Sequence, residues 1–206
     1  MELPRPVAVR VSRLAVKEAL LEPLLRRMRI RQVLPVVLQH PECRLLDIGC
    51  GWEARLLRAV EPHVASAVGV DFKAPRIATA KITTIASTLA DALPFPDASF
   101  DVVTLLAVLE HLAHPRAMVE EIARVLRPGG EVVLTVPSKA AKPVLEFLAY
   151  RVHLVSEAEI RDHKAYYDAS TLRTLLKDSG LRVLRHRYFQ LGMNNFLIAT
   201  REAARA

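Results

Sequence analysis

The stretch LLDIGCG (residues 45–51) joins a short apolar run to a turn with two glycines. The run predicts a buried strand, and WEARLLRAVEPH (52–63) after it predicts a helix. Without Cβ atoms, Gly49 and Gly51 let the backbone approach a bound ligand closely, and a side chain at Gly49 is expected to occupy ligand space. Doubly wound α/β folds bind ligands at this place, beyond the carboxyl end of a central strand.

Apolar runs and helical patterns alternate along most of the chain. Strands separated by helices predict an α/β fold with a doubly wound, mostly parallel sheet and helices on both faces. Only LGMN (191–194) separates the last two strands, so they are expected to pair antiparallel. The predicted strands are 44–49, 65–71, 81–87, 99–107, 131–137, 181–190 and 195–201. Helices are predicted over 52–63, 114–126 (closed by Pro128-Gly129-Gly130), about 139–162 and 169–178.

The N-terminal segment differs from the rest of the chain. Residues 1–40 are predicted to form a helical cap segment and residues 41–206 a single α/β domain. Apolar residues recur at helical spacing over 12–39, with Pro23 and Pro35 expected to divide the helix. This segment has eight Lys or Arg and three acids, a net +5 (8 − 3) of the chain's +7. A solvated helix face explains this charge; nucleic acid, an anionic membrane or an acidic substrate are the alternatives.

The composition predicts a soluble, cytoplasmic protein. The chain has 206 residues, 51% of them hydrophobic, and its two cysteines, Cys43 and Cys50, make no disulfide framework. The first residues lack an apolar core with a cleavage site, so no signal peptide is expected. The longest apolar stretch, 102–109, is too short to span a membrane.

An acid follows the second predicted strand, at Asp71, where it can accept both hydrogens of a ribose diol. A nucleoside-containing cofactor is therefore expected. Residues 49–54 also fit the dinucleotide pattern G-x-G-x-x-A. However, Asp47 before the glycines and Glu53 in the first predicted helical turn would repel a pyrophosphate. Asp47 suits a cation such as the amino group of a methionine moiety, so electrostatics favour S-adenosylmethionine over NAD.

Four motifs in order carry a family resemblance: LLDIGCG (45–51), VGVD (68–71), LPFPDASFDVVTLLAVLEHL (93–112) and RVLRPGGEVVLTVPS (124–138). They resemble the motifs of class I S-adenosylmethionine-dependent methyltransferases, and are most similar to the type 11-like bacterial group with ubiquinone- and menaquinone-type and small-molecule or lipid enzymes. The resemblance covers residue 43 to the C-terminus. It implies a Rossmann-like, seven-stranded sheet with an antiparallel last strand, and S-adenosyl-L-methionine as cofactor.

The resemblance also implies the cofactor-binding residues. The methionine end would lie at Asp47, Gly49, Cys50 and Gly51, and the ribose at Asp71. Phe72, Thr88, Leu89 and Leu106 complete the expected cofactor site around the adenine and the fourth strand, with Asp91 an alternative adenine contact. The chain departs from the family in having Glu53 where a third glycine is common and Leu89 where many relatives have an acid.

The acceptor side is expected after the fourth strand. Glu110 and His111 are candidate catalytic residues, as a base or a contact to substrate or metal; alternatively they cap the start of a helix. His111 and His114 form H-x-x-H without an evident third ligand, so no metal site is predicted. Charged and aromatic residues crowd the segment 159–167, and are predicted to bind an anionic or hydroxyl-rich acceptor: Arg161, His163, Lys164, Tyr166 and Tyr167.

These residues predict methyl transfer to a small-molecule, lipid or saccharide acceptor. The alternatives are a non-catalytic cofactor-binding or scaffolding protein and an NAD-dependent oxidoreductase. The N-terminal helices are expected to cover the acceptor pocket, with peripheral membrane contact through their basic residues. Residues 1–40 contain no aromatic residue to stack on bases, so nucleic acid is not a predicted partner. The sequence gives no prediction of the oligomeric state.

Overall fold

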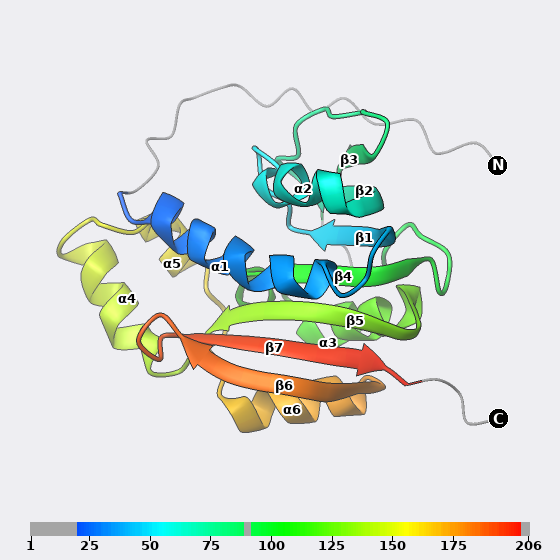
Figure 1. Cartoon of the computed structure of the whole chain (residues 1–206). Helices are drawn as coiled ribbons and strands as arrows, with labels where there is room; N and C mark the ends of the chain where they lie inside the picture. The colour runs from blue at the N-terminus through cyan, green and yellow to red at the C-terminus, as the bar shows by residue number, and fades with distance from the viewer. Residues whose placement is uncertain (1–19, 89–91, 203–206) are drawn as a thin grey trace.

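The computed structural model describes residues 20–88 and 92–202. Seven strands form one sheet in the order β3-β2-β1-β4-β5-β7-β6 (Figure 1). β7 runs antiparallel to both β5 and β6, and the other adjacent pairs are parallel. The predicted mostly parallel sheet with an antiparallel last strand is confirmed. The strands are β1 Cys43–Ile48, β2 Val64–Asp71, β3 Ile82–Ala86, β4 Phe100–Leu106, β5 Leu126–Pro137, β6 Leu181–Phe189 and β7 Asn194–Arg201.

The strand order reverses between β1 and β4. From β1 the sheet grows through β2 to β3 on one side and through β4 to β5 on the other. Asp47 of β1 is in register with Thr104 of β4, so both lie close to the carboxyl ends of their strands. The connections that leave these two ends diverge, which opens the sheet edge to a ligand at this position.

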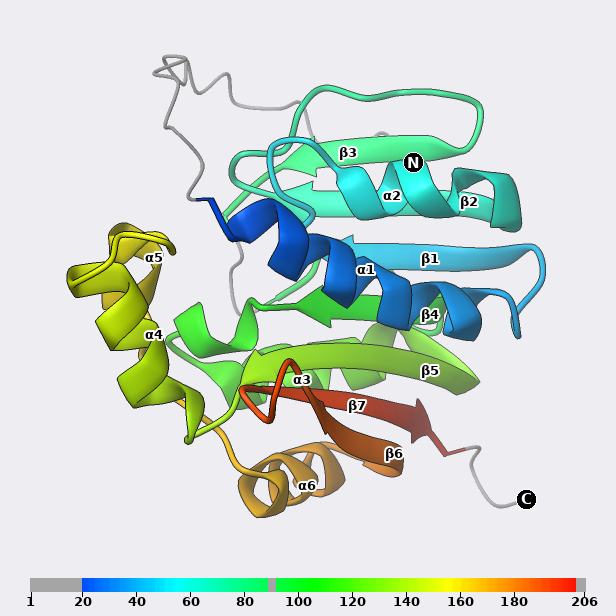
Figure 2. The same cartoon turned by 60° about the vertical axis from the view of Figure 1, so that its left-hand side comes forward.

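Helices cover both faces of the sheet, as predicted. α1 (Glu22–Val37) and α2 (Arg55–Val60) lie on one face, and α3 (Pro115–Val125) and α6 (Ala169–Asp178) lie on the other (Figures 1 and 2). Alternate residues of a strand enter the two cores: Leu45 packs in the cluster of α1 and α2, and Leu46 in that of α3 and α6. No helix lies in the described parts of the connections β2–β3 and β3–β4.

α1 continues through Pro35, so the expected division at Pro35 is wrong. The expected division at Pro23 depends on residues 12–19 and stays a prediction. Pro23 occupies the first turn, where a backbone N–H has no helical partner in any case. Pro35 lies within the helix close to its end, next to the buried Val33 and Val36. Burial of these valines against the sheet offsets the hydrogen bond lost at the proline. The prediction for residues 12–19 lies outside the described residues.

Three other predicted boundaries need correction. The helix after the glycine turn begins at Arg55 rather than at residue 52, because Ala54 has left-handed backbone (φ +50°), and a 3₁₀ turn η1 (Glu61–His63) follows it. α3 ends at Val125, and Pro128-Gly129-Gly130 lies within β5. The predicted helix over 139–162 is two helices, α4 (Ala141–Tyr150) and α5 (Glu157–Arg161).

α4 and α5 lie at the carboxyl edge of the parallel strands, next to the start of α1 (Figure 2). Ala149 of α4 and Ile160 of α5 form a small apolar cluster with Leu21 and Leu25 of the α1 region. The α4–α5 region and the start of α1, which are distant in sequence, therefore meet at the edge of the sheet where the glycine turn lies. Within residues 20–88 and 92–202, no helix combines the length and apolar character needed to cross a membrane.

Candidate functional site

The glycine turn after β1 is held to the end of β2 by its backbone. The N–H groups of Gly49 and Cys50 donate to the carbonyl of Val70 at 2.8 and 3.3 Å. The Gly51 N–H donates to Asp71 Oδ2 at 3.0 Å. The sequence predicts that the glycine turn and Asp71 bind the same ligand. In the structure a hydrogen bond joins them.

The Asp71 carboxylate is oriented by two backbone donors and keeps further acceptor sites. Its Oδ1 accepts the Lys73 N–H at 2.7 Å, so each carboxylate oxygen has one backbone donor. Each oxygen keeps a further acceptor site, and the residue is 9% exposed. Two oriented acceptor sites at the end of β2 match the hydrogens of a ribose diol.

The two glycines of the turn differ in what surrounds them. Gly49 has φ +80°, and a Cβ there would lie 2.2 Å from Val108 Cγ2. Gly51 has φ +69°, and a Cβ there would meet nothing within 4 Å. The expectation that a side chain at Gly49 occupies ligand space is therefore wrong, because it would strike the segment after β4. The open space lies at Gly51.

Asp47 is a buried acid beside the turn, 3% exposed. Its Oδ1 accepts the Thr104 hydroxyl at 2.6 Å, and Oδ2 has no hydrogen-bond partner among the described residues. Burial, with repulsion from Asp71, raises the pKa of Asp47 to about 7, although the Thr104 hydrogen bond opposes this rise. The two neighbouring carboxyl groups give this part of the site a preference for a cation.

The Cys50 side chain is buried in the core on the α1 and α2 side of the sheet. Its Sγ would lie 2.8 Å from a Cβ at Gly69, on the core side of β2. Burial, with repulsion from Asp47 and Asp71, raises the pKa of the Cys50 thiol well above its usual value. The thiol is a core group rather than a nucleophile or metal ligand.

The structure revises the electrostatic role of Glu53. This residue precedes α2 instead of standing in its first turn. Its carboxylate pairs with Arg26 of α1 at 3.1 Å and with Arg55, so its charge is compensated. The electrostatic argument against a pyrophosphate therefore depends on Asp47 and not on Glu53.

The predicted adenine contacts occupy an open region. Phe72 directly follows Asp71 and is 57% exposed, and Thr88 is exposed after β3. Leu106 ends β4, half-buried against the α1 and α2 core. Leu89 and Asp91 lie outside the described residues. These assignments therefore stay predictions.

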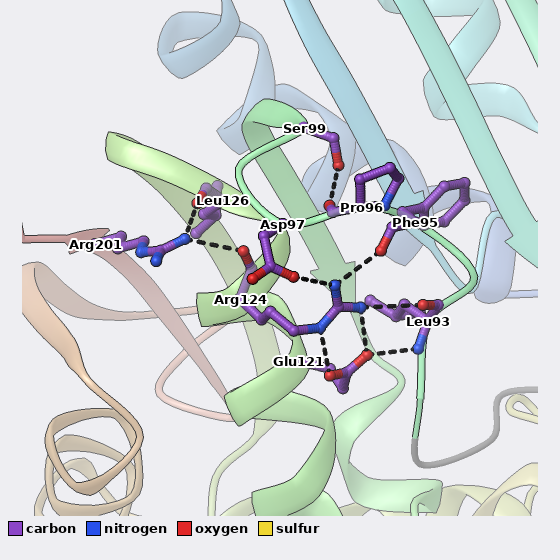
Figure 3. Close-up of polar contacts among 9 residues, drawn as sticks. All are labelled: Leu93, Phe95, Pro96, Asp97, Ser99, Glu121, Arg124, Leu126 and Arg201. Atoms are coloured by element: carbon purple, nitrogen blue, oxygen red, sulfur yellow. Dashed lines mark hydrogen bonds and ion pairs between the residues drawn. The ribbon is translucent and has the colours of Figure 1, made fainter.

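Arg124 on α3 holds the connection into β4, a role the sequence analysis missed. Its guanidinium donates five hydrogen bonds of 2.7–3.0 Å (Figure 3). The acceptors are the carbonyls of Leu93 and Phe95 and the carboxylates of Asp97 and Glu121. Glu121 also accepts the Leu93 N–H at 2.7 Å. The arginine of RVLRPGG thus fixes the LPFPD segment, which leads from the expected adenine side to β4.

The acceptor-side candidates meet across two chain segments. Glu110 and His111 lie in a 3₁₀ turn after β4, η2 (Leu109–His111). The Lys164 N–H donates to the Glu110 carbonyl at 2.8 Å, and Lys164 Nζ donates to the His111 carbonyl at 2.6 Å. The rings of His111 and His163 have centroids 4.8 Å apart. The structure therefore brings Glu110, His111, His163 and Lys164 together.

The environments of these groups differ. Glu110 is 1% exposed, and its Oε2 is buried without a hydrogen-bond partner among the described residues. Burial raises the pKa of Glu110 to about 8. Burial, with repulsion from His111, lowers the pKa of His163 to about 4. His111 Nδ1 lies 3.0 Å from Asp162 Oδ2, which orients its ring. Neither side chain is the N-cap residue of η2 or of α3, which are Val108 and His114.

The three other predicted acceptor contacts, Tyr166, Tyr167 and Arg161, differ from one another in their surroundings. The Tyr166 hydroxyl lies 3.1 Å from His163 Nδ1 and belongs to the same cluster. Tyr167 is 6% exposed and packs in the core below the sheet. Arg161 is exposed and pairs with Glu157 on its own helix. Among the described residues, Arg161 has no contact with this cluster. Tyr167 lies near Glu110: burial, with repulsion from that carboxyl group, raises the pKa of the Tyr167 hydroxyl. Asp162, which orients His111, was missed because its partner is distant in sequence.

Comparison with known proteins gives the family. A methyltransferase-domain family model matches residues 11–186, most of the chain. This protein belongs to the methyltransferase family, in agreement with the class I, type 11-like resemblance of its motifs.

Two relatives and one solved structure illustrate the similarity. The chain is 31% identical over 164 residues to the uncharacterized methyltransferase YcgJ of Bacillus subtilis, covering 68% of this chain and 62% of the relative. It is 32% identical over 124 residues to a ubiquinone biosynthesis O-methyltransferase of Idiomarina loihiensis, covering 54% and 49%. The chain thus spans less than two thirds of these relatives. An S-adenosylmethionine-dependent methyltransferase of Mesorhizobium loti shares the fold, with a TM-score of 0.63, 18% identity, and 84% and 95% coverage.

Proposed function

We propose that this protein transfers a methyl group from S-adenosylmethionine to a small-molecule, lipid or saccharide acceptor. The observation that carries the proposal is the pair of acids at the glycine turn. Asp47 has a free carboxylate oxygen, and Asp71 has two oriented acceptor sites. The space in front of Gly51 has room for a ligand. This site fits a ligand with a ribose diol and a positively charged amino acid end.

Each residue has a distinct part in the proposed reaction. Asp47 would bind the ammonium group, Asp71 the ribose hydroxyls, and the backbone at Gly51 would allow close approach. The cofactor supplies a methyl group that is already activated as a sulfonium, so the protein mainly positions the acceptor in line and excludes water. For a hydroxyl acceptor, His111 would accept the proton at Nε2, with Asp162 holding its ring.

The proposed acceptor class is based on the residues that surround His111. His163, Lys164 and Tyr166 offer hydrogen-bonding groups beside His111, which suits a hydroxyl-bearing acceptor. One relative is named a ubiquinone biosynthesis O-methyltransferase, in accord with an oxygen acceptor on a lipid-like molecule. α1 with its arginines borders this region, which supports its role as a cap and a contact with membrane lipids.

The test is cofactor binding, followed by turnover. Calorimetry on the full chain is expected to show binding of S-adenosylhomocysteine and none of NAD. NAD binding alone would instead favour an oxidoreductase. Incubation of an extract with labelled S-adenosylmethionine then identifies the acceptor. Cofactor binding without transfer to any acceptor would favour a non-catalytic or scaffolding protein.

A matched pair of variants locates the site. Asp71→Asn is expected to weaken S-adenosylhomocysteine binding by about 1–3 kcal/mol, because ribose hydroxyls lose an acceptor. Asp101→Asn is the control: this carboxylate also accepts a backbone N–H, from Arg44 at 2.8 Å, but at the opposite end of β4. Equal affinities in the two variants would remove Asp71 from the proposed site.

A further inference from the structure

Three side chains with metal-binding donors meet at the carboxyl edge of the sheet. One donor atom from each of Glu110, His111 and His163 lies within 4.8 Å of the other two. The sequence analysis paired His111 with His114 and found no third ligand. The structure pairs it instead with His163 from the segment after α5. We propose that Glu110, His111 and His163 bind a divalent transition-metal ion.

The carboxylate provides the first independent support. Glu110 is 1% exposed, and its Oε2 is buried with no hydrogen-bond partner among residues 20–88 and 92–202. A buried polar oxygen without a donor is costly in a folded protein and indicates an absent ligand. A cation beside Oε2 would satisfy this oxygen.

The imidazoles provide the second support. His111 Nδ1 is bonded to Asp162 Oδ2 at 3.0 Å, and His163 Nδ1 to the Tyr166 hydroxyl at 3.1 Å. Within the described part of the chain, neither Nε2 atom has a hydrogen-bond partner. Histidine ligands of metals usually have one ring nitrogen held by an outer partner such as a carboxylate, which directs the other to the metal. Asp162 and Tyr166 occupy these outer positions.

The donor set indicates which ions fit. Two imidazole nitrogens and one carboxylate oxygen suit Zn²⁺ and related transition-metal ions and leave coordination positions open. Ligand atoms around one such ion lie no more than about 4 Å apart, so small side-chain rotations must close the present separation.

The two imidazole donors narrow the choice of ion further. Imidazole nitrogen binds Zn²⁺ well and Mg²⁺ weakly, so His111 and His163 favour Zn²⁺ over Mg²⁺. A His111 that is bound to metal through Nε2 has no lone pair for a proton, so the ligand and base roles exclude each other. Metal binding itself does not depend on methyl transfer.

The experiment uses metal-free full-length protein titrated with Co²⁺ as a spectroscopic substitute for Zn²⁺. We expect visible absorption bands that saturate at about one equivalent and disappear when Zn²⁺ is added. Glu110→Gln and His163→Gln should each weaken binding at least tenfold, and Asp162→Asn should weaken it about tenfold. Circular dichroism confirms that each variant is folded; the exposed Asp162 and half-buried His163 are the substitutions least disruptive to the core.

His114→Gln is the matched control, since His114 lies close in sequence but outside the cluster. Its Co²⁺ affinity should equal that of the unmodified protein. Absence of Co²⁺ bands from the folded protein would overturn the proposal. The proposal would also be overturned if the Glu110, His163 and Asp162 variants bound Co²⁺ as tightly as the unmodified protein does. That result is expected for adventitious binding by surface histidines. Loss of binding in His114→Gln would restore the H-x-x-H pair and equally reject the cluster.

Discussion

Asp47 illustrates how one buried carboxyl group can couple protonation to ligand binding. It is 3% exposed, and burial together with Asp71 raises its pKa to about 7. Below this pH the free protein holds a neutral carboxylic acid, and above it a carboxylate. A cationic ligand prefers the carboxylate and lowers the pKa when it binds, so ligand binding releases a proton at acidic pH.

The sign of this coupling gives the first prediction. The affinity for S-adenosylhomocysteine, whose amino acid end keeps the ammonium group, should rise as pH increases from about 5.5 to about 7.5, on the order of tenfold, and level off above the Asp47 pKa. Calorimetry at several pH values measures this. Asp47→Asn, which cannot ionise, should bind more weakly at pH 7.5 and lose most of the pH dependence. An unchanged pH profile in this variant would mean that Asp47 does not face the cofactor.

The two glycines of the turn make a second prediction at the same scale. Both have positive φ, but a Cβ at Gly49 would lie 2.2 Å from Val108 Cγ2, while at Gly51 it meets nothing within 4 Å. Gly49→Ala should therefore lower the free energy of unfolding by about 2–4 kcal/mol, from backbone strain and overpacking. Gly51→Ala should cost about 1–2 kcal/mol of stability and chiefly weaken cofactor binding.

The control for backbone strain is Gly180→Ala. Gly180 has φ +82° and open space, but it follows α6 on the far side of the sheet from α1. Denaturant unfolding should give it the same stability loss as Gly51→Ala, with normal S-adenosylhomocysteine affinity. If Gly49→Ala is no less stable than Gly180→Ala, the clash with Val108 does not lower the free energy of unfolding.

At the scale of elements, the sequence predicts helices, strands and turns correctly where the contacts that determine them are local. β1, its glycine turn and Asp71 follow from periodicity and motif spacing, because neighbouring parallel strands end at the same edge. The exceptions are positions where tertiary packing outweighs local preference. Pro35 stays inside α1 because Val33 and Val36 are buried on the sheet, and α2 starts late because Ala54 adopts φ +50°.

Contacts between distant segments could not be predicted in this way. Glu110 and His111 were singled out from the strand end, but their neighbours His163 and Asp162 come from the segment around α5. No periodicity relates these positions, and the tight pairing of Lys164 with η2 appears only in three dimensions. The buried Tyr167 shows the same limit, because a charged and aromatic segment gives no sign of which ring turns to the core.

Arg124 gives a prediction about the connection between elements. Its five hydrogen bonds join α3 to the segment from Leu93 to Asp97 (Figure 3). Arg124→Ala should lower the free energy of unfolding by about 2–3 kcal/mol, because the carbonyls and Glu121 lose charged donors while the partly exposed site readmits water. Arg124→Lys should recover little, because an ammonium group cannot reproduce the planar fork.

Thermal unfolding and hydrogen exchange measure this effect. Exchange should increase mainly at the backbone amides around Leu93 and Ala98, which donate to Glu121 and to the Arg124 carbonyl. Arg116→Ala is the control, since Arg116 on the same helix forms an exposed i,i+4 ion pair with Glu120. Equal stability of the two variants would show that the Arg124 network does not hold the connection.

At the scale of the whole molecule, basic and apolar side chains gather beside the proposed acceptor site. Arg27 and Arg31 of α1 are exposed. Near the start of α1, Leu20 and Leu24 are 79% and 55% exposed, and Phe147 of the adjacent α4 is 59% exposed. The cluster of Leu21 and Leu25 with α4 and α5 holds these surfaces side by side (Figure 2). Exposed apolar side chains and exposed arginines on neighbouring elements suit the surface of an anionic membrane.

The last prediction is that the full chain binds vesicles containing anionic lipid more tightly than neutral vesicles, with an affinity that falls as salt increases. Phe147→Ser should weaken this binding about tenfold, because one large apolar side chain no longer enters the interface. Leu184→Ser is the matched control, since Leu184 is 44% exposed on β6, away from α4.

Removing residues 1–19 leaves α1 intact and should also weaken vesicle binding while S-adenosylhomocysteine still binds. Equal loss in the Phe147 and Leu184 variants would reject a defined membrane-facing surface. Salt-sensitive RNA or DNA binding that is lost with residues 1–19, without vesicle binding, would instead make nucleic acid the partner of the basic segment.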